Sequence, residues 1–464
     1  MRLTRRRLLQ SAALAALSSG GLYELVDRLG GAPQRARAGS SDKLQLDRLG
    51  EQHLLGGVRH VVDRGVEVEV PPLHHRVVTA RVVLRGGRAG LREAQEELEA
   101  RLRALERTHE PTPAGLGITV AWGLPYFRRH VPDAWARHAP FDRRAQKPSL
   151  LDTRRFPSDR DDVLLEANDL AVLLRSDQLE HVTGGARELF HGFDALRVTS
   201  VRNGFAGGGF DGGRSLPKRM AVAAGVAGAE HIPDTAELFL GFTSTQRAAL
   251  GPARIANLET LGYTANNAYF RGGTHMHLSH MYEDLERWYR DFSFDERVWT
   301  SFGPTLRVPP GTQTVRQVPD ADDDAAAIVR QYRHTGVLGH SSGIQTASRL
   351  QRDVLGEDGT LYRKGTAVPQ RADFNTLDNP FAWSAEPRRD RMRPGPAAGV
   401  HFVAFHPTSD DFDRVRLAMD GVLPDGSRLP FEPNDRAQGF NSILRTTHRQ
   451  NFLVPPRKYA LFAV

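Results

Sequence analysis

The stretch RVVTARVVLRGG at residues 76–87, followed by LREAQEELEARLRALERTH at residues 91–109, decides the fold class. The first segment alternates and is rich in valine, which is typical of a β-strand. The second consists largely of good helix formers, and its leucines recur at the spacing of one helix face. These leucines are Leu91, Leu98, Leu102 and Leu105. A strand that leads into an amphipathic helix predicts the start of an α+β unit.

Further strand and helix patterns complete this unit and repeat its theme near the other end of the chain. Residues 114–127 and 162–174 predict strands, and residues 176–190 predict a helix, which together form a ferredoxin-like pattern. Residues 399–406 predict another strand, and residues 409–422 a helix. We therefore expect an α+β fold with two ferredoxin-like halves, of the dimeric α+β barrel type, with antiparallel sheets and peripheral helices.

The first 38 residues predict an export signal. TRRRLLQ at residues 4–10 places paired arginines ahead of Leu-Leu, and the apolar run SAALAAL follows. Ala36-Arg37-Ala38 fits a small-x-small cleavage site. The apolar run is too short to span a bilayer. The leader looks like a twin-arginine signal peptide, so we expect a protein exported to the periplasm, cell wall or medium, with no stable membrane insertion after cleavage.

The rest of the chain is expected to form two domains. Residues 39–200 are assigned to an N-terminal ferredoxin-like domain and residues 201–464 to a C-terminal one. The first part, residues 39–75, is polar and mixed, and predicts a loosely packed segment. Residues 202–235 are rich in glycine and predict a long loop, which in a compact domain is usually functional or a lid.

Charge and cysteine content exclude several classes of function. The net charge is +7, but residues 1–38 hold seven arginines and only two acids, so most of the excess lies in the leader. The mature chain therefore lacks the strongly basic surface of a nucleic-acid-binding protein. There is no cysteine, which excludes disulfides, thiolate-ligated haem, iron–sulfur clusters and cysteine nucleophiles.

Several segments, taken in order, resemble the dye-decolorising (DyP-type) haem peroxidases. They are GITVAWGLPYF, DVLLEANDLAVLL, LGFTST, GGTHMHLSHMYEDLERW, GVLGHSSG, QRADFN, GVHFVAFH and NFLVPP. The resemblance covers residues 76–464 in segments, and the chain looks like a divergent branch of that superfamily that is exported by the twin-arginine route. It implies a pair of ferredoxin-like domains with haem b held in the second.

The resemblance also implies roles for two residues. His340, in GVLGHSSG, would be the proximal iron ligand and the only metal ligand, with His334 as its rival. Arg371, in QRADFN, would be the distal arginine, since a permanently charged guanidinium can stabilise the negative charge that develops as a peroxide O–O bond breaks. The spacing between His340 and Arg371 is longer than usual in the family. Other arginines could therefore serve instead, namely Arg349, Arg352 or Arg363.

One departure from the family concerns the distal acid. The family carries an aspartate in a Gly-Phe-x-Asp-Gly element, whereas this chain reads GFTST at residues 241–245, with Ser244 in the place of the aspartate. A hydroxyl cannot take the peroxide proton as readily as a carboxylate. Asp211, in the glycine-rich stretch, or Asp373, just after Arg371, could supply the carboxylate. Without that role, Asp211 would be a turn residue and Asp373 a salt-bridge partner or loop cap.

The run HMHLSHM is a second place where ligands could gather. His275 and His277 share one face of the expected strand, while His280 lies on the other. We expect His275 and His277 to support the haem pocket or to contact the haem propionates, with Arg349 and Phe405 as further cofactor contacts. The alternative is a separate copper site, because imidazoles with a nearby methionine suit that metal.

The function expected from these features is that of an exported haem b peroxidase-like protein. It would oxidise phenolic or dye-like reductants with hydrogen peroxide, and a homo-oligomer is left open. Two alternatives remain. Ser244 favours a haem-binding or haem-handling protein with little turnover, and the three histidines His275, His277 and His280 leave room for a haem-free relative that binds copper.

Overall fold

The computed structural model of the chain describes residues 21–31, 50–210, 213–265, 269–316, 325–432 and 436–459. Its N-terminal half is a ferredoxin-like unit with the strand order β9-β3-β8-β4, in which the outer strands are the last and the second of the unit. The elements of this half are β3 (His74–Val82), α3 (Gly87–Thr108), β4 (Gly117–Gly123), β8 (Leu170–Ser176), α6 (Leu179–Phe190) and β9 (Leu196–Phe205). β9 spans the expected domain boundary at residue 200.

The C-terminal half repeats this order as β17-β11-β16-β15. A short strand, β14, pairs beside β15 on β16. The elements of this half are β11 (Thr274–Glu283), β14 (Gln370–Arg371), β15 (Phe374–Thr376), β16 (Gly399–His406), α13 (Ser409–Met419) and β17 (Leu444–Val454). Two ferredoxin-like halves with antiparallel sheets confirm the expected fold class.

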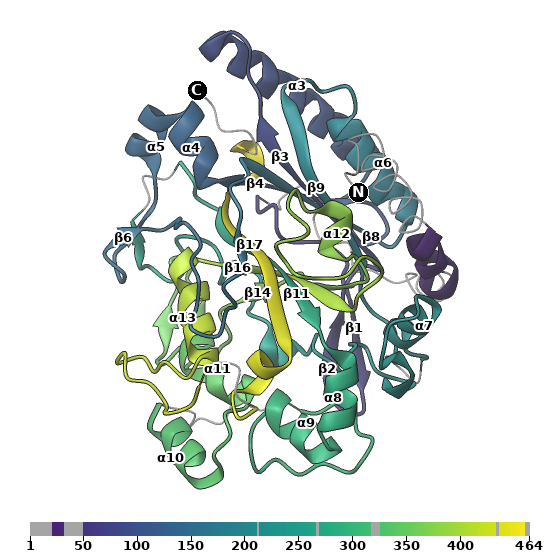
Figure 1. Cartoon of the computed structure of the whole chain (residues 1–464). Helices are drawn as coiled ribbons and strands as arrows, with labels where there is room; N and C mark the ends of the chain where they lie inside the picture. Colours follow the sequence, from purple (N-terminus) through teal and green to yellow (C-terminus); the bar gives the residue numbers. More distant parts are fainter. Residues whose placement is uncertain are drawn as a thin grey trace.

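The two halves join edge to edge into one sheet of 10 strands, with β7 (Leu164–Leu165) outside β17. β9 pairs with β15 on one side and β4 with β17 on the other. Because β11 and β17 also pair, the sheet closes on itself as a barrel. Figure 1 shows α3 and α6 along the outside of the first half, while α13 lies beside the strands of the second.

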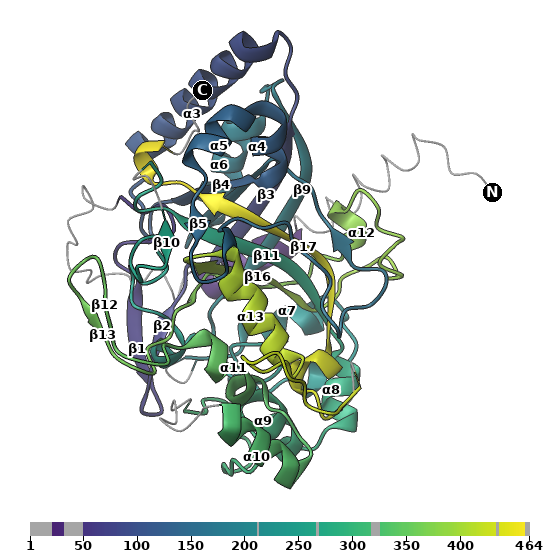
Figure 2. The same ribbon diagram turned by 90° about the vertical axis from the view of Figure 1, so that its left-hand side faces the viewer.

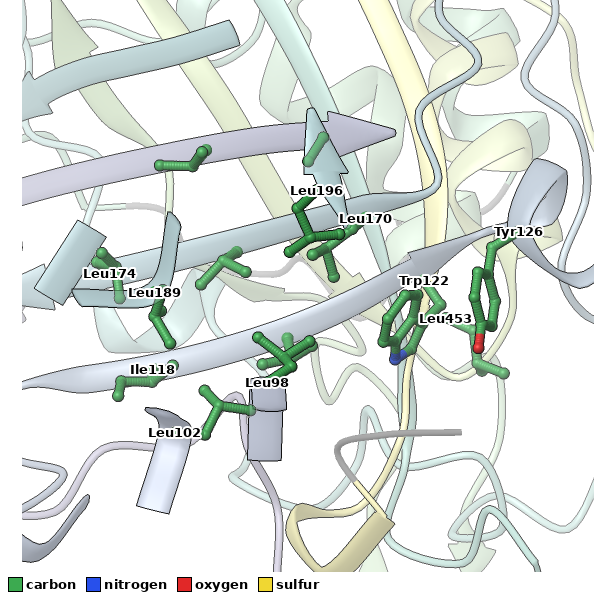
Figure 3. Packing of buried hydrophobic residues seen from close by; sticks show 14 of the residues in the cluster. Leu98, Leu102, Ile118, Trp122, Tyr126, Leu170, Leu174, Leu189, Leu196 and Leu453 are labelled. Carbon is green, nitrogen blue, oxygen red and sulfur yellow. The ribbon is translucent and has the colours of Figure 1, made fainter. Parts of the chain in front are cut away.

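The helix expected at 91–109 is present as α3, and its four leucines are all buried against the sheet. Figure 3 shows two of them, Leu98 and Leu102, packed near Ile118 and Leu170. A second apolar cluster fills the barrel interior, with Val77 from β3, Met276 from β11 and further small or aromatic side chains. The outer face of the C-terminal sheet is therefore separate from this core, and it is the face that α13 covers (Figure 2).

Further helices flank the C-terminal half, and short elements fill the connections. The helices are α8 (Leu285–Asp291), α9 (Phe294–Ser301), α10 (Ala325–Thr335), α11 (His340–Ser348) and α12 (Pro380–Trp383). The short strands are β1 (Arg59–Asp63), β2 (Val66–Val70), β5 (Phe141–Asp142), β6 (Lys147–Pro148), β10 (Thr264–Ala265), β12 (Val354–Leu355) and β13 (Leu361–Tyr362).

Four local predictions need correction. The expected strand at residues 162–174 is two separate strands, β7 and β8. The expected strand 114–127 ends at Gly123, and α4 (Leu124–His130) begins there because Pro125 suits a first helical turn; α5 (Pro132–His138) follows. The glycine-rich stretch contains α7 (Leu216–Ala223), which Ser215 caps by accepting a hydrogen bond from the Lys218 backbone N–H. The segment before β3 holds the β1–β2 hairpin, so it is more ordered than expected.

Part of the predicted leader packs on the body of the protein. Residues 21–31 are helical, and Tyr23 and Val26 are buried. The Tyr23 hydroxyl lies 2.9 Å from the Asn203 carbonyl oxygen and 3.1 Å from Asp378 Oδ1, and its proton can be donated to either. Residues 1–20 and 32–49, which include the arginine pair and the expected cleavage site, lie outside the described residues. Within the described ranges, no helix is both long and apolar enough to cross a bilayer.

Candidate functional site

A cavity of about 220 Å³ lies on the outer face of the C-terminal half. Alternate side chains of β11 and β16 form one wall, and α11, α13 and the turn η5 (Gly439–Ser442) contribute the others. Most of its lining is apolar, including Leu240, Phe242, Ile344, Phe402, Phe412 and Phe440. Such walls exclude water, so charges inside the cavity interact more strongly than they would in bulk solvent.

His340 lines this cavity from the first residue of α11. The glycine before it is required by packing, since a Cβ on Gly339 would lie 2.5 Å from the Cα of Gly303. The His340 ring lies 4.7 Å from the Phe440 ring, and its Nδ1 is buried without a hydrogen-bond partner among the described residues. Burial, followed by the charges of Arg371 and Arg416, lowers the pKa of His340 to about 4. The imidazole is therefore neutral at physiological pH and able to bind a metal.

Arg371, Asp373 and Ser244 meet at the same cavity. β14 pairs with β16 so that Arg371 lies opposite Ala404, and its Nη2 donates to the Ser244 carbonyl at 2.5 Å. Its Nε is buried and has no partner among the described residues. The structure thus brings Arg371, Asp373 and Ser244, three of the expected site residues, to one cavity. Asp211 lies outside the described residues.

The alternative arginines differ in their placement. Arg349 lines the cavity, but it donates to the carbonyls of Gly365 and Ala248, each at 2.8 Å, which occupies much of its hydrogen-bonding capacity. Arg352 is exposed, and Arg363 pairs with Asp353 at the surface. Of these three alternatives, only Arg349 lines the cavity.

His275 and His277 are buried and held by protein atoms. His275 contacts the Pro407 carbonyl at 2.9 Å and Ser149 Oγ at 3.1 Å. His277 contacts Asn451 Oδ1 and Ser279 Oγ, each at 2.6 Å, and stacks on Phe412 of the cavity wall. Both nitrogens of each ring are therefore engaged with protein atoms.

His280 points to the opposite side of the sheet, beside His401 in the barrel interior. Because a strand turns alternate side chains to opposite faces, His280 does not converge with His275 and His277 on one metal position, and no group of three or more metal-ligating side chains is found within the described ranges. Phe405 also faces the barrel interior, where it packs with the apolar core instead of lining the cavity. His334 is exposed near the end of α10.

An ionic cluster closes another part of the cavity. Arg449 and Asp159 form a bidentate pair with two contacts of 2.6 Å, and both side chains are buried. Arg416 joins them, 3.5 Å from Asp159 and 2.9 Å from Asp420. These guanidinium groups bring positive charge to the lining, but each is already compensated by a carboxylate.

Two glutamates were missed by sequence reasoning, one in the cavity lining and one behind it. Glu283 lines the cavity from the end of β11, its Oε2 has no partner among the described residues, and burial raises its pKa to about 8. The alternation of β11 could have found it, because Glu283 shares the strand face of His275 and His277. Glu237 lies behind the 243–245 loop, and nothing in its sequence context signals this contact.

Comparison with known proteins places the fold. A family model described as "Family of unknown function (DUF7405)" matches residues 72–456, and no curated protein matches the sequence. A putative DyP-type peroxidase from Shewanella oneidensis is similar in structure, with a TM-score of 0.52 at 13% identity, over 85% of this chain and 96% of that one. A DypB variant from Rhodococcus jostii RHA1, solved in complex with heme, has a TM-score of 0.50 at 13% identity, over 89% and 98%. The chain therefore has the fold of the DyP-type peroxidases.

Proposed function

The chain belongs to the family of unknown function DUF7405, and we propose that it is an exported, haem b-binding, peroxidase-like protein. Its substrates would be hydrogen peroxide and small phenolic or dye-like reductants. The observation that carries the proposal is that a neutral His340 with an unpartnered Nδ1 and the guanidinium of Arg371 line one apolar-walled cavity. The shared fold with DyP-type peroxidases, one of them solved with heme, supports the same reading.

The residues present fit haem in chemistry. His340 would hold the iron, because its imidazole is neutral and its Nδ1 is not committed to a protein partner. Arg371, held by the Ser244 carbonyl, would orient and stabilise an anionic ligand. Bound haem supplies redox chemistry toward peroxide that side chains alone do not. The apolar walls would exclude bulk water from that chemistry.

The volume of the cavity requires its lining side chains to move if haem is to enter. Its volume of about 220 Å³ is below the roughly 300–1,000 Å³ of typical ligand pockets. A ligand as large as haem would therefore displace lining side chains as it enters. Met281 and Met419, both in the lining, are suited to this because methionine side chains are flexible.

A second candidate is a haem-binding or haem-handling protein with little turnover. The observation that favours it is the partner of Arg371 on the 243–245 loop, which is a backbone carbonyl and not a carboxylate. A carbonyl cannot accept and return a proton as a general base does. Haem binding without turnover would therefore support this candidate over the first.

Haem titration of the purified protein tests the proposal. We expect a Soret band in the wild-type protein and in His334→Ala, because His334 is exposed at the end of α10, and a lost or shifted band in His340→Ala. Oxidation of a phenolic dye with hydrogen peroxide then separates the two candidates. A His340→Ala protein with full haem and an unchanged spectrum would rule out His340 as the ligand.

Export by the twin-arginine route and assembly into a homo-oligomer are further parts of the proposal. The arginine pair ahead of Leu8-Leu9 supports export. Replacing Arg6 and Arg7 with lysine should retain the protein inside the cell, and export of that variant at the wild-type level would contradict the route. Light scattering of the purified protein would give the oligomeric state.

A further inference from the structure

Glu237 holds the 243–245 loop, which carries Ser244. Its carboxylate is 2% exposed. The Ser244 backbone N–H donates to Oε2 at 2.8 Å, and the Thr245 hydroxyl donates to Oε1 at 3.3 Å. Its backbone carbonyl accepts from Asn375 Nδ2 at 3.2 Å. One glutamate thus connects the 243–245 loop with β15, the strand that follows Arg371.

The same loop connects Glu237 to the guanidinium. Ser244 donates its N–H to Glu237 and accepts from Arg371 through its carbonyl. The charged groups that face the Glu237 carboxylate are Asp373 and Arg371. Burial raises the pKa of Glu237 to about 7, and Asp373 adds to this, while the Ser244 N–H and Arg371 oppose it. The carboxylate therefore changes its charge near neutral pH.

We propose that Glu237 is a positioning residue for Arg371 that acts through the 243–245 loop. It holds the 243–245 loop and, through the Ser244 carbonyl, the Arg371 guanidinium. It also sets the charge that an incoming ligand meets. When Glu237 is ionised, the carboxylates of Glu237 and Asp373 both offset the positive charge of the Arg371 guanidinium. When Glu237 carries a proton, only the Asp373 carboxylate does so. Small anions at Arg371 are therefore bound more tightly when Glu237 is protonated.

This inference rests on the proposed function for its ligand site, and azide binding to the haem-loaded protein tests it. In the wild-type protein, azide affinity should fall about tenfold as the pH rises through about 7, which is the effect of one added charge at roughly 12 Å in an effective dielectric of about 20. Glu237→Gln should bind azide at high pH as tightly as the wild-type protein does at low pH. Azide's own protonation is the same for all variants, so it cancels in the comparison.

Two further variants make the comparison specific. Glu259→Gln is the matched control, because Glu259 also accepts a backbone N–H, from Gly272, and burial also raises its pKa, but it faces other charges. It should keep the wild-type pH dependence. Glu237→Asp should retain a pH-dependent step, which a merely structural role for the residue would not require. If the azide affinity of Glu237→Gln falls with pH as it does in the wild-type protein, the inference is overturned and the proposed function still stands.

The Tm of the haem-free protein tests the titration of Glu237 separately from the proposed function. The raised folded-state pKa means that Glu237 contributes stability that is fully present below pH 4.5, its ordinary pKa, and is lost as the pH rises through about 7. In the haem-free protein, Glu237→Gln should therefore flatten the fall in Tm across this window. Glu259→Gln should retain the part of the fall in Tm that is centred near pH 7. If the protein does not bind haem, but Glu237→Gln flattens the Tm profile, the proposed function is contradicted while the titration of Glu237 is supported. Identical Tm profiles overturn the inference.

Discussion

Replacing Glu283 with glutamine should make the protein markedly more stable at alkaline pH. Glu283 lines the cavity from the end of β11, and its Oε2 has no hydrogen-bond partner among the described residues. Burial alone raises its pKa from 4.5 to about 8. The folded protein therefore holds this carboxyl in its neutral form up to mildly alkaline pH, while the unfolded chain ionises it freely.

The sign and size of the effect follow from this difference. A carboxyl whose pKa is raised on folding contributes stability that is complete below pH 4.5 and is lost progressively as the pH rises through about 8. At 1.36 kcal/mol for each pKa unit, the total loss is about 5 kcal/mol. Glutamine has nearly the same shape and no charge, so Glu283→Gln should lack this contribution to the pH dependence.

Urea denaturation at about pH 4.5 and about pH 9 measures it. Between these two values, the wild-type free energy of unfolding should fall by about 4 kcal/mol more than that of Glu283→Gln, because the unfolded carboxyl is already half ionised at pH 4.5. Titration of other groups, Glu237 included, is common to both proteins and cancels. Glu93→Gln, at an exposed position on α3, serves as a control and should follow the wild-type curve. Equal falls in the wild-type protein and Glu283→Gln would refute the reasoning, because they would mean that Glu283 has a partner that stabilises its charge.

Three other substitutions test the packing around the site and the core. In protein that keeps residues 21–31, Tyr23→Phe removes the hydroxyl that contacts Asp378 and should lower the free energy of unfolding by about 1–3 kcal/mol, as urea denaturation would show. Leu98→Ala opens a cavity under α3 and should cost about 2–5 kcal/mol in the same assay. Arg449→Met leaves Asp159 buried without its bidentate partner and should cost about 3–5 kcal/mol. A loss below about 0.5 kcal/mol for any of them, the usual range for surface changes, would contradict the contact described.

Local patterns predicted the fold class because each ferredoxin-like half is built from consecutive strands and helices. The leucines of α3 are spaced to meet the sheet, and all four are buried. The strand expected at residues 399–406 is present with these bounds as β16. α7 was missed because glycines dominate the stretch around it, whereas the Ser215 cap that starts this helix is a single residue.

The candidate site was predicted in part, through the resemblance to a known family. Residues as distant in the chain as Ser244, His340 and Arg371 line one cavity, as that resemblance implied. The same reasoning placed Phe405 among the cofactor contacts, whereas β16 turns that side chain to the barrel interior. The strand periodicity alone says which residues share a face, but it does not say which face meets the cavity.

By itself, the sequence determined the main strands and helices of the ferredoxin-like halves, the absence of cysteine chemistry and the basic N-terminal segment, because these depend on neighbouring residues or on composition. Only the tertiary structure decided which polar groups meet. β11 and β17 close the barrel, and that closure gives the C-terminal sheet an outer face on which α11 and α13 enclose the cavity. The charge of Glu237 and Glu283 depends on how deeply the folded chain buries them, since burial is what raises the pKa of each. Burial is a property of the assembled chain, and no single segment of the sequence carries it.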